Sequence, residues 1–167
     1  LLGACASPEQ PMPPAQPSAP ASQPVPPPPP AEPAPQTGGS TEAQVQFQIG
    51  LDLAARGRHT EAIEVYQRAA RLAPGDFRIH YNLGNAYARQ LDYPRAIQAY
   101  LRVLELDSTQ VSARHNLAGL YVRQLNYAQA IAEHQQVLKL DPGHISTYRD
   151  LAHIYFTRGE YPQVETL

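Results

Sequence analysis

Apolar and small residues within residues 43–167 recur at spacings of three and four, and the whole arrangement repeats every 34 residues. Residues three or four positions apart lie on the same face of a helix, so each stretch with this spacing predicts an amphipathic helix. Every complete unit contains two such stretches. The pattern therefore predicts helical hairpins in units 43–76, 77–110 and 111–144, and in an incomplete fourth unit, 145–167.

The side chains at the repeated positions suit close helix packing. Small residues allow two backbones to approach, and large rings fill the groove beside them. In unit order, the residues are Gly50, Gly84, Ala118 and Ala152 at position 8, Leu53, Tyr87, Tyr121 and Tyr155 at position 11, Ala62, Ala96, Ala130 and Val164 at position 20, and Tyr66, Tyr100 and His134 at position 24. We interpret His134, which stands where the other units have tyrosine, as a packing residue.

Several residues mark helix starts. Thr41 with Gln44, and Asn126 with Gln129, have the spacing of a capping box at a helix N-terminus. In a capping box, the side chain of each residue of the pair accepts a hydrogen bond from the backbone N–H of the other. Pro94 falls in a first turn, where proline is tolerated because its missing N–H would have no partner there.

The set of in-phase positions resembles the tetratricopeptide-repeat family over residues 43–167. The resemblance implies an all-α fold, a right-handed superhelical solenoid of helix-turn-helix repeats. The chain departs from the family pattern at Gln46, His80, Arg114 and Tyr148, where the family often has Trp, Leu or Tyr, and at Ser108, where it often has proline. These departures leave the fold class unchanged and slightly weaken the packing that we expect at the third unit.

Residues 6–41 are almost entirely Pro, Ala, Gln and Ser, with Met12 and Val25 as the large apolar side chains. Such a segment cannot bury enough apolar surface to offset the entropy of ordering it. The prolines from Pro26 to Pro30 favour the extended polyproline II conformation. We therefore interpret residues 6–41 as a disordered linker that acts as a spacer, with SH3-type ligand recognition as an alternative.

The short segment 1–5 ends in small residues next to the single cysteine, Cys5. Leu2, Gly3, Ala4 and Cys5 resemble the lipobox of bacterial lipoproteins. The resemblance implies cleavage before Cys5, lipidation of its sulfur and amine, and a lipid anchor in the membrane. Ala6 at the next position resembles the outer-membrane sorting pattern, so we expect a location in the bacterial cell envelope, in the outer membrane facing the periplasm.

Charge and motifs argue against several functions. The basic and acidic residues nearly balance within the repeats, so there is no basic patch of the kind that nucleic acids require. The sequence lacks a His-x-x-x-His pair, a glycine-rich phosphate loop and a nucleophile elbow. We therefore expect no enzyme activity, no small-molecule substrate, no cofactor and no metal.

The family resemblance also implies where a ligand binds. In this family the first helices of the repeats line a concave groove, and position 6 of each unit faces it. Here position 6 reads Gln48, Asn82, Asn116 and Asp150, which resembles an asparagine ladder that holds the backbone of an extended peptide. An amide suits this role because it both donates and accepts hydrogen bonds.

Further groove residues follow from the neighbouring inward positions. They are Arg78, Tyr81, Asn85, Arg89, His115, Arg123, Arg149, His153 and Phe156. Four arginines against one aspartate favour an acidic ligand or a C-terminal carboxylate. The chaperone-type carboxylate clamp is not reproduced, because Phe47 and Leu51 stand where its Lys and Asn would be. The alternative is that these polar residues only solvate an exposed helix face.

Together these features predict a membrane-tethered adaptor that binds a protein or peptide. The combination of lipobox, spacer and repeats resembles bacterial lipoproteins that assist type IV pilus or secretin assembly, or that dock envelope enzymes. The alternative is the substrate-docking region of a larger enzyme, such as a protein O-linked glycosyltransferase. Since the fourth unit stops at its 23rd position, Leu167, we expect the natural protein to continue with more repeats or a further domain.

Overall fold

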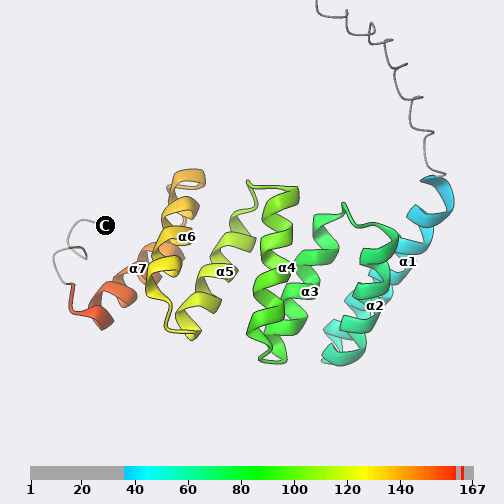
Figure 1. Ribbon diagram of the computed structural model, residues 1–167, viewed down its shortest axis with the longest axis horizontal. Coiled ribbons are helices and arrows are strands. Elements are labelled where there is room, and N and C mark those ends of the chain that lie inside the picture. The colour runs from blue at the N-terminus through cyan, green and yellow to red at the C-terminus, as the bar shows by residue number, and fades with distance from the viewer. Residues whose placement is uncertain (1–35, 161–162, 164–167) are drawn as a thin grey trace, which may run out of the picture. The chain divides into compact units, whose positions relative to one another are not determined.

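The computed structural model describes residues 36–160 and 163, with side chains from residue 41 onward. These residues form seven α-helices and no β-strand (Figure 1). The helices are α1 (Gln36–Ala55), α2 (His59–Leu72), α3 (Phe77–Arg89), α4 (Tyr93–Leu106), α5 (Val111–Arg123), α6 (Tyr127–Leu140) and α7 (Ile145–Arg158). The all-α fold class predicted from the sequence is confirmed. Within the described residues, no helix is both long and apolar enough to cross a membrane.

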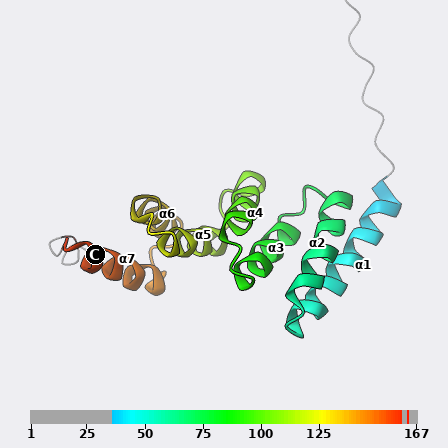
Figure 2. The ribbon, with the colours of Figure 1, turned by 60° about the horizontal axis from the view of Figure 1, so that its bottom comes forward.

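Neighbouring helices pack as hairpins that stack along the chain. α1 packs against α2, α3 against α4, and α5 against α6, and the second helix of each pair contacts the helix that follows it (Figures 1 and 2). Helices α3, α5 and α7 begin at Phe77, Val111 and Ile145, the first residues of the second, third and fourth sequence units. Each unit thus supplies one helix pair to the stack, with α7 as the first helix of the fourth.

The first helix differs from the sequence interpretation at its start. α1 begins at Gln36, so Thr41 lies inside the helix and the predicted cap at Thr41 is wrong. The hydrophobic pattern begins only at Ala43, which is why the sequence did not reveal the earlier turns. Residues 1–35, which include Cys5 and most of the predicted linker, lie outside the described residues, as do 161–162 and 164–167.

Side chains cap three of the later helices. Asn126 accepts a hydrogen bond of 3.4 Å from the Gln129 N–H at the start of α6, as its sequence spacing predicts. Asp76 accepts from the Arg78 N–H at 3.0 Å, and Asp92 from the Arg95 N–H at 3.2 Å. Each cap satisfies a backbone donor that has no partner within the helix, which fixes where α3, α4 and α6 begin.

The packing of each hairpin depends on a small residue opposite a ring. A Cβ added at Gly84 would lie 2.9 Å from Cε1 of the buried Tyr100, and one added at Gly50 would lie even closer to Tyr66. Glycine is therefore required at position 8 where position 24 is tyrosine. In the third unit the same two positions are Ala118 and His134, both fully buried. A larger side chain at position 8 accompanies a smaller ring at position 24.

The turn within each hairpin uses a left-handed residue at the same unit position. This residue is Gly57 (φ 75°), Leu91 (φ 60°), Leu125 (φ 59°) and Gly159 (φ 73°) in the four units. Glycine adopts this conformation without strain, whereas a leucine does so at a cost in free energy. Leu91 and Leu125 thus adopt the same left-handed turn conformation as the two glycines, although leucine disfavours it.

Candidate functional site

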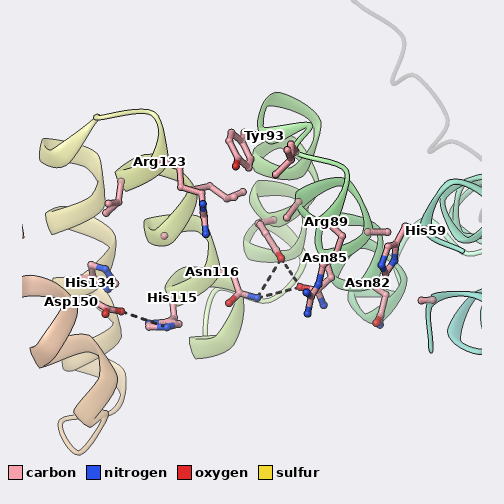
Figure 3. A pocket seen from close by; sticks show the side chains of 18 of the residues that line it. His59, Asn82, Asn85, Arg89, Tyr93, His115, Asn116, Arg123, His134 and Asp150 are labelled. Atoms are coloured by element: carbon pink, nitrogen blue, oxygen red, sulfur yellow. Dashed lines mark hydrogen bonds and ion pairs between the residues drawn. The ribbon is translucent and has the colours of Figure 1, made fainter. Parts of the chain in front are cut away.

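A cavity of about 1070 Å³ is lined by residues of all seven described helices, from the end of α1 to α7 (Figure 3). Eight of the thirteen groove residues predicted from the sequence line it: Asn82, Asn85, Arg89, His115, Asn116, Arg123, Asp150 and His153. All eight come from α3, α5 and α7, which are first helices of their units. These helices therefore present their polar faces to one shared space.

The other predicted residues lie outside this lining. Gln48 is exposed on α1, and Phe156 is exposed on α7. The Arg78 guanidinium is paired with the Asp76 carboxylate at 2.6 Å. Arg149 is 77% exposed, with its Nε 3.8 Å from Asp150. The fifth predicted residue outside the lining, Tyr81, takes part in a hydrogen-bonded network with Asn116.

That network joins two repeat units through Asn116. Its Nδ2 donates to Tyr81 Oη at 3.2 Å and to Asn85 Oδ1 and Tyr100 Oη at 3.3 Å each. Tyr100 in turn donates to Asn85 Oδ1 at 2.5 Å (Figure 3). Burial raises the pKa of Tyr100 above its usual range, so its hydroxyl remains a donor at neutral pH. The network fixes the orientation of both asparagines.

The position-6 side chains therefore differ in what they contact. Asn116 spans the boundary between units, whereas Asn82 donates at 2.8 Å to the backbone oxygen of Arg78 in its own helix. Asp150 faces His115, with 3.7 Å between Oδ2 and Nε2. A peptide bound along the cavity would meet carboxamides whose N–H groups are already engaged by the protein. What these carboxamides can bind therefore depends on the donors and acceptors that they have left unpaired, and on the arginines beside them.

Two of the four predicted arginines are available to a ligand. Within residues 36–160 and 163, neither Arg89 nor Arg123 takes part in an ion pair, and both line the cavity. Arg123 stacks over the Tyr93 ring, with its Cζ 6.0 Å from the ring centroid. Figure 3 shows Arg89 beside the asparagines of α3 and Arg123 on α5. An unpaired guanidinium in a partly enclosed space favours an anionic partner.

A histidine cluster forms the other end of the cavity. The ring of His115 lies 5.6 Å from that of His134 and 5.0 Å from that of His144, measured between centroids. Burial lowers the pKa of His115, an effect that the Asp150 carboxylate partly offsets. Burial also lowers the pKa of His134 to about 4, again against the opposing effect of Asp150. Both imidazoles are therefore neutral at pH 7.

Some lining residues were missed by the sequence interpretation. His59 and Tyr93, the first residues of α2 and α4, both line the cavity. They occupy position 17 of their units, where the third unit has Tyr127, so a recurring ring at position 17 was the available signal. His134 was interpreted as packing. It is indeed fully buried, but it also contributes to the cavity wall.

Comparison with known proteins identifies the repeats. Residues 47–111 match the family model described as tetratricopeptide repeat. No curated protein sequence matches the chain.

Solved structures share the fold at low sequence identity. The crystal structure of MamA is similar over 76% of this chain and 74% of MamA, with a TM-score of 0.73 and 20% identity. The first TPR of Spaghetti (RPAP3), bound to the HSP90 peptide SRMEEVD, is similar over 72% of this chain and 95% of its own, with a TM-score of 0.69 and 20% identity. The Arabidopsis OM64 TPR domain is similar over 72% of this chain and 99% of its own, with a TM-score of 0.69 and 17% identity. These similarities confirm the predicted solenoid of helical hairpins.

Proposed function

We propose that this chain, whose residues 47–111 match the tetratricopeptide-repeat family model, is a non-catalytic scaffold whose cavity binds an acidic segment of a partner protein. The observation that carries the proposal is the pair of unpaired arginines, Arg89 and Arg123, in a cavity that also holds three asparagines. Carboxylates of a partner satisfy the guanidinium groups, and backbone amides satisfy the carboxamides. The partner therefore binds in an extended conformation, with its peptide groups exposed.

A structural neighbour supports the type of ligand. The first TPR of Spaghetti (RPAP3) is bound to an HSP90 peptide of sequence SRMEEVD, which contains three acidic residues. In our chain the acidic ligand is held differently, because Phe47 is buried and Leu51 is half-buried where the chaperone-type clamp would need polar groups. The cations of this cavity instead lie at Arg89 and Arg123, near the ends of α3 and α5.

A peptide array tests this proposal with the full 167-residue chain. We expect acidic peptides to bind more tightly than versions with Asn and Gln in place of Asp and Glu, and the preference to weaken as salt increases. The Arg89→Ala/Arg123→Ala variant should bind at least about a hundredfold more weakly, because two lost charge-assisted hydrogen bonds of roughly 1.5 to 3 kcal/mol each total about 3 kcal/mol or more.

The matched control is Arg102→Ala/Lys139→Ala, which removes two cations from α4 and α6 outside the cavity lining. This variant should retain the affinity of the parent chain. Equal binding of acidic and neutral peptides, or equal loss in both variants, would place the binding surface elsewhere.

We further propose that the scaffold is held in the bacterial outer membrane by lipid on Cys5. The support is the likeness of Leu2, Gly3, Ala4 and Cys5 to a lipobox, and the proline-rich spacer that follows it in sequence. Expressed with a lipoprotein signal sequence, the protein should fractionate with membranes, whereas Cys5→Ala should not. Unchanged fractionation of Cys5→Ala would end the anchor proposal without affecting the proposal about the cavity.

The process we propose for such a scaffold is envelope assembly of the type IV pilus or secretin kind. Its support is the combination of lipobox, spacer and repeats in one sequence. We expect the parent chain to capture pilus or secretin subunits from intact envelopes, and the Arg89→Ala/Arg123→Ala variant not to capture them. Capture of glycosyltransferase substrates instead would favour the alternative, a docking region of a larger enzyme.

A further inference from the structure

Three potential metal ligands converge where α5, α6 and α7 meet. His115 comes from α5, His134 from α6 and Asp150 from α7, and one ligand atom of each lies within 4.8 Å of the others. His115 Nε2 and Asp150 Oδ2 are 3.7 Å apart. Figure 3 shows the three side chains pointing toward one another at one end of the cavity. Two imidazoles and a carboxylate are a donor set that divalent transition metals use in proteins.

A separate observation marks this cluster as incomplete. His134 is fully buried, and within the described residues neither of its ring nitrogens has a hydrogen-bond partner. A buried polar atom without a partner costs roughly 1 to 3 kcal/mol, so such atoms are rare in folded proteins unless a ligand or water satisfies them. The equivalent Tyr100 is also buried, but its hydroxyl is hydrogen-bonded to Asn85 and Asn116, so a polar ring at this position can be satisfied within the protein.

We propose that His115, His134 and Asp150 bind a divalent transition metal ion, with Zn²⁺ as the best match. In a tetrahedral zinc site with bonds of about 2.0 to 2.1 Å, ligand atoms stand roughly 3.3 Å apart, so small side-chain rotations bring this cluster into place. Calcium and magnesium fit less well because they prefer oxygen ligands. Three protein ligands leave the fourth position open toward the cavity.

A neighbouring hydroxyl orients one of the proposed ligands. His115 Nδ1 lies 3.4 Å from the Thr147 hydroxyl, which also contacts His144 Nδ1 at 2.8 Å. Such a contact on the far nitrogen orients a ligating imidazole. A bound ion would join α7 to the α5–α6 hairpin.

The inference departs from the sequence-based expectation of no metal. His115, His134 and Asp150 are too widely separated along the chain to form a recognisable ligand motif. Only the stacking of two repeat units brings them together. The proposal does not depend on whether the cavity also binds a partner protein.

Calorimetric titration of the untagged 167-residue chain with Zn²⁺, after treatment with EDTA and desalting, tests the proposal. A Cys5→Ser background removes the thiol as a competing ligand. We expect one Zn²⁺ per chain, a dissociation constant in the micromolar range or tighter, and a rise of several degrees in the melting temperature. Co²⁺ in the same site should show the visible absorption bands of tetrahedral coordination.

Two variants remove the site by different routes. Ala118→Gly/His134→Phe restores the glycine and aromatic ring that the first two units use, so the hairpin stays packed while a ligand is lost. Asp150→Asn changes a half-buried side chain with little effect on the fold. Each should weaken Zn²⁺ binding at least tenfold, whereas His80→Ala, which removes a half-buried histidine of α3 outside the cavity lining, should not.

Each outcome is informative. Absence of Zn²⁺ binding to the parent chain overturns the proposal and leaves a water molecule as the partner of His134. Binding that survives both Ala118→Gly/His134→Phe and Asp150→Asn also overturns it, as does an equal loss in His80→Ala.

Discussion

Asn116 on α5 donates a hydrogen bond of 3.3 Å to Asn85 Oδ1 on α3, across the boundary between two repeat units. The same amide contacts the hydroxyls of Tyr81 and Tyr100. Asn116 therefore acts first as a structural link between the second and third units. Its effect on ligand binding follows from the orientation that it gives to Asn85, which lines the cavity.

Asn116→Ala should lower the free energy of unfolding by about 1 to 3 kcal/mol, because it leaves partly buried acceptors without their donor. Asn82→Ala is the matched control. Its amide donates to the backbone of its own helix, so its loss should cost at most about 1 kcal/mol. Urea midpoints of the two variants at pH 7 provide the comparison. Equal midpoints would show that the Asn116 network does not join the units energetically.

The buried His134 should make stability depend on pH. Its pKa is about 4 in the folded protein and roughly 6.5 in the unfolded chain, so the unfolded state binds more protons between these values. Stability is therefore fully present above about pH 6.5 and declines as the pH falls toward 4, by up to about 3 kcal/mol. His115, His144 and Asp150 face the ring, and His115 contributes with the same sign.

Thermal melts between pH 4 and 7 in EDTA measure this dependence. Ala118→Gly/His134→Phe should lose less stability over this range than the parent chain, while it retains the smaller contribution of His115. Parallel loss of stability in the two proteins would show that the pKa of His134 is not depressed in the folded state.

Much of the fold followed from the sequence because every unit obeys the same packing constraint. The small residue at position 8 and the ring at position 24 recur in phase, and this recurrence placed the starts of α3, α5 and α7. The start of α1 at Gln36 could not be obtained in this way, since residues 36–40 contain two glycines and no hydrophobic pattern.

The candidate site was only partly predictable for a different reason. Periodicity indicates which residues face inward, and eight of the thirteen groove residues do line the cavity. It does not indicate which partner each side chain selects. Arg78 pairs with Asp76 rather than facing a ligand, and the contacts of His134 depend on the neighbouring unit. These contacts depend on side-chain rotamers and on how neighbouring units stack, and periodicity determines neither.

The left-handed turn residue Leu125 offers a stabilising substitution. Leu125 is 72% exposed at φ 59°, so Leu125→Gly loses little burial and removes a strain of roughly 1 to 2 kcal/mol. The greater entropy of glycine in the unfolded chain offsets part of this gain. We expect a net increase of about 0.5 to 1 kcal/mol in the free energy of unfolding, measured by urea denaturation.

Gly57→Ala is the reverse test at the same unit position in the first hairpin. A Cβ at Gly57 meets no atom within 4 Å, so any destabilisation arises from the backbone conformation at φ 75°. The two substitutions should change stability in opposite directions. A loss of stability in Leu125→Gly would mean that the exposed leucine makes contacts that offset its strain.

Two glycines in neighbouring first helices should respond oppositely to alanine. In Gly84→Ala the new Cβ would lie 2.9 Å from Cε1 of Tyr100, whose hydroxyl is held by Asn85 and Asn116, so the ring cannot move away freely. Overpacking of this kind costs about 1 to 3 kcal/mol and should also disturb the asparagines of the cavity.

In Gly119→Ala the Cβ meets nothing within 4 Å, and alanine is favoured over glycine in a helix by roughly 0.5 to 1 kcal/mol. We therefore expect the urea midpoint to fall for Gly84→Ala and to rise for Gly119→Ala. A neutral Gly84→Ala would show that the Tyr100 ring shifts without loss, and the glycine requirement at position 8 would then not explain the sequence.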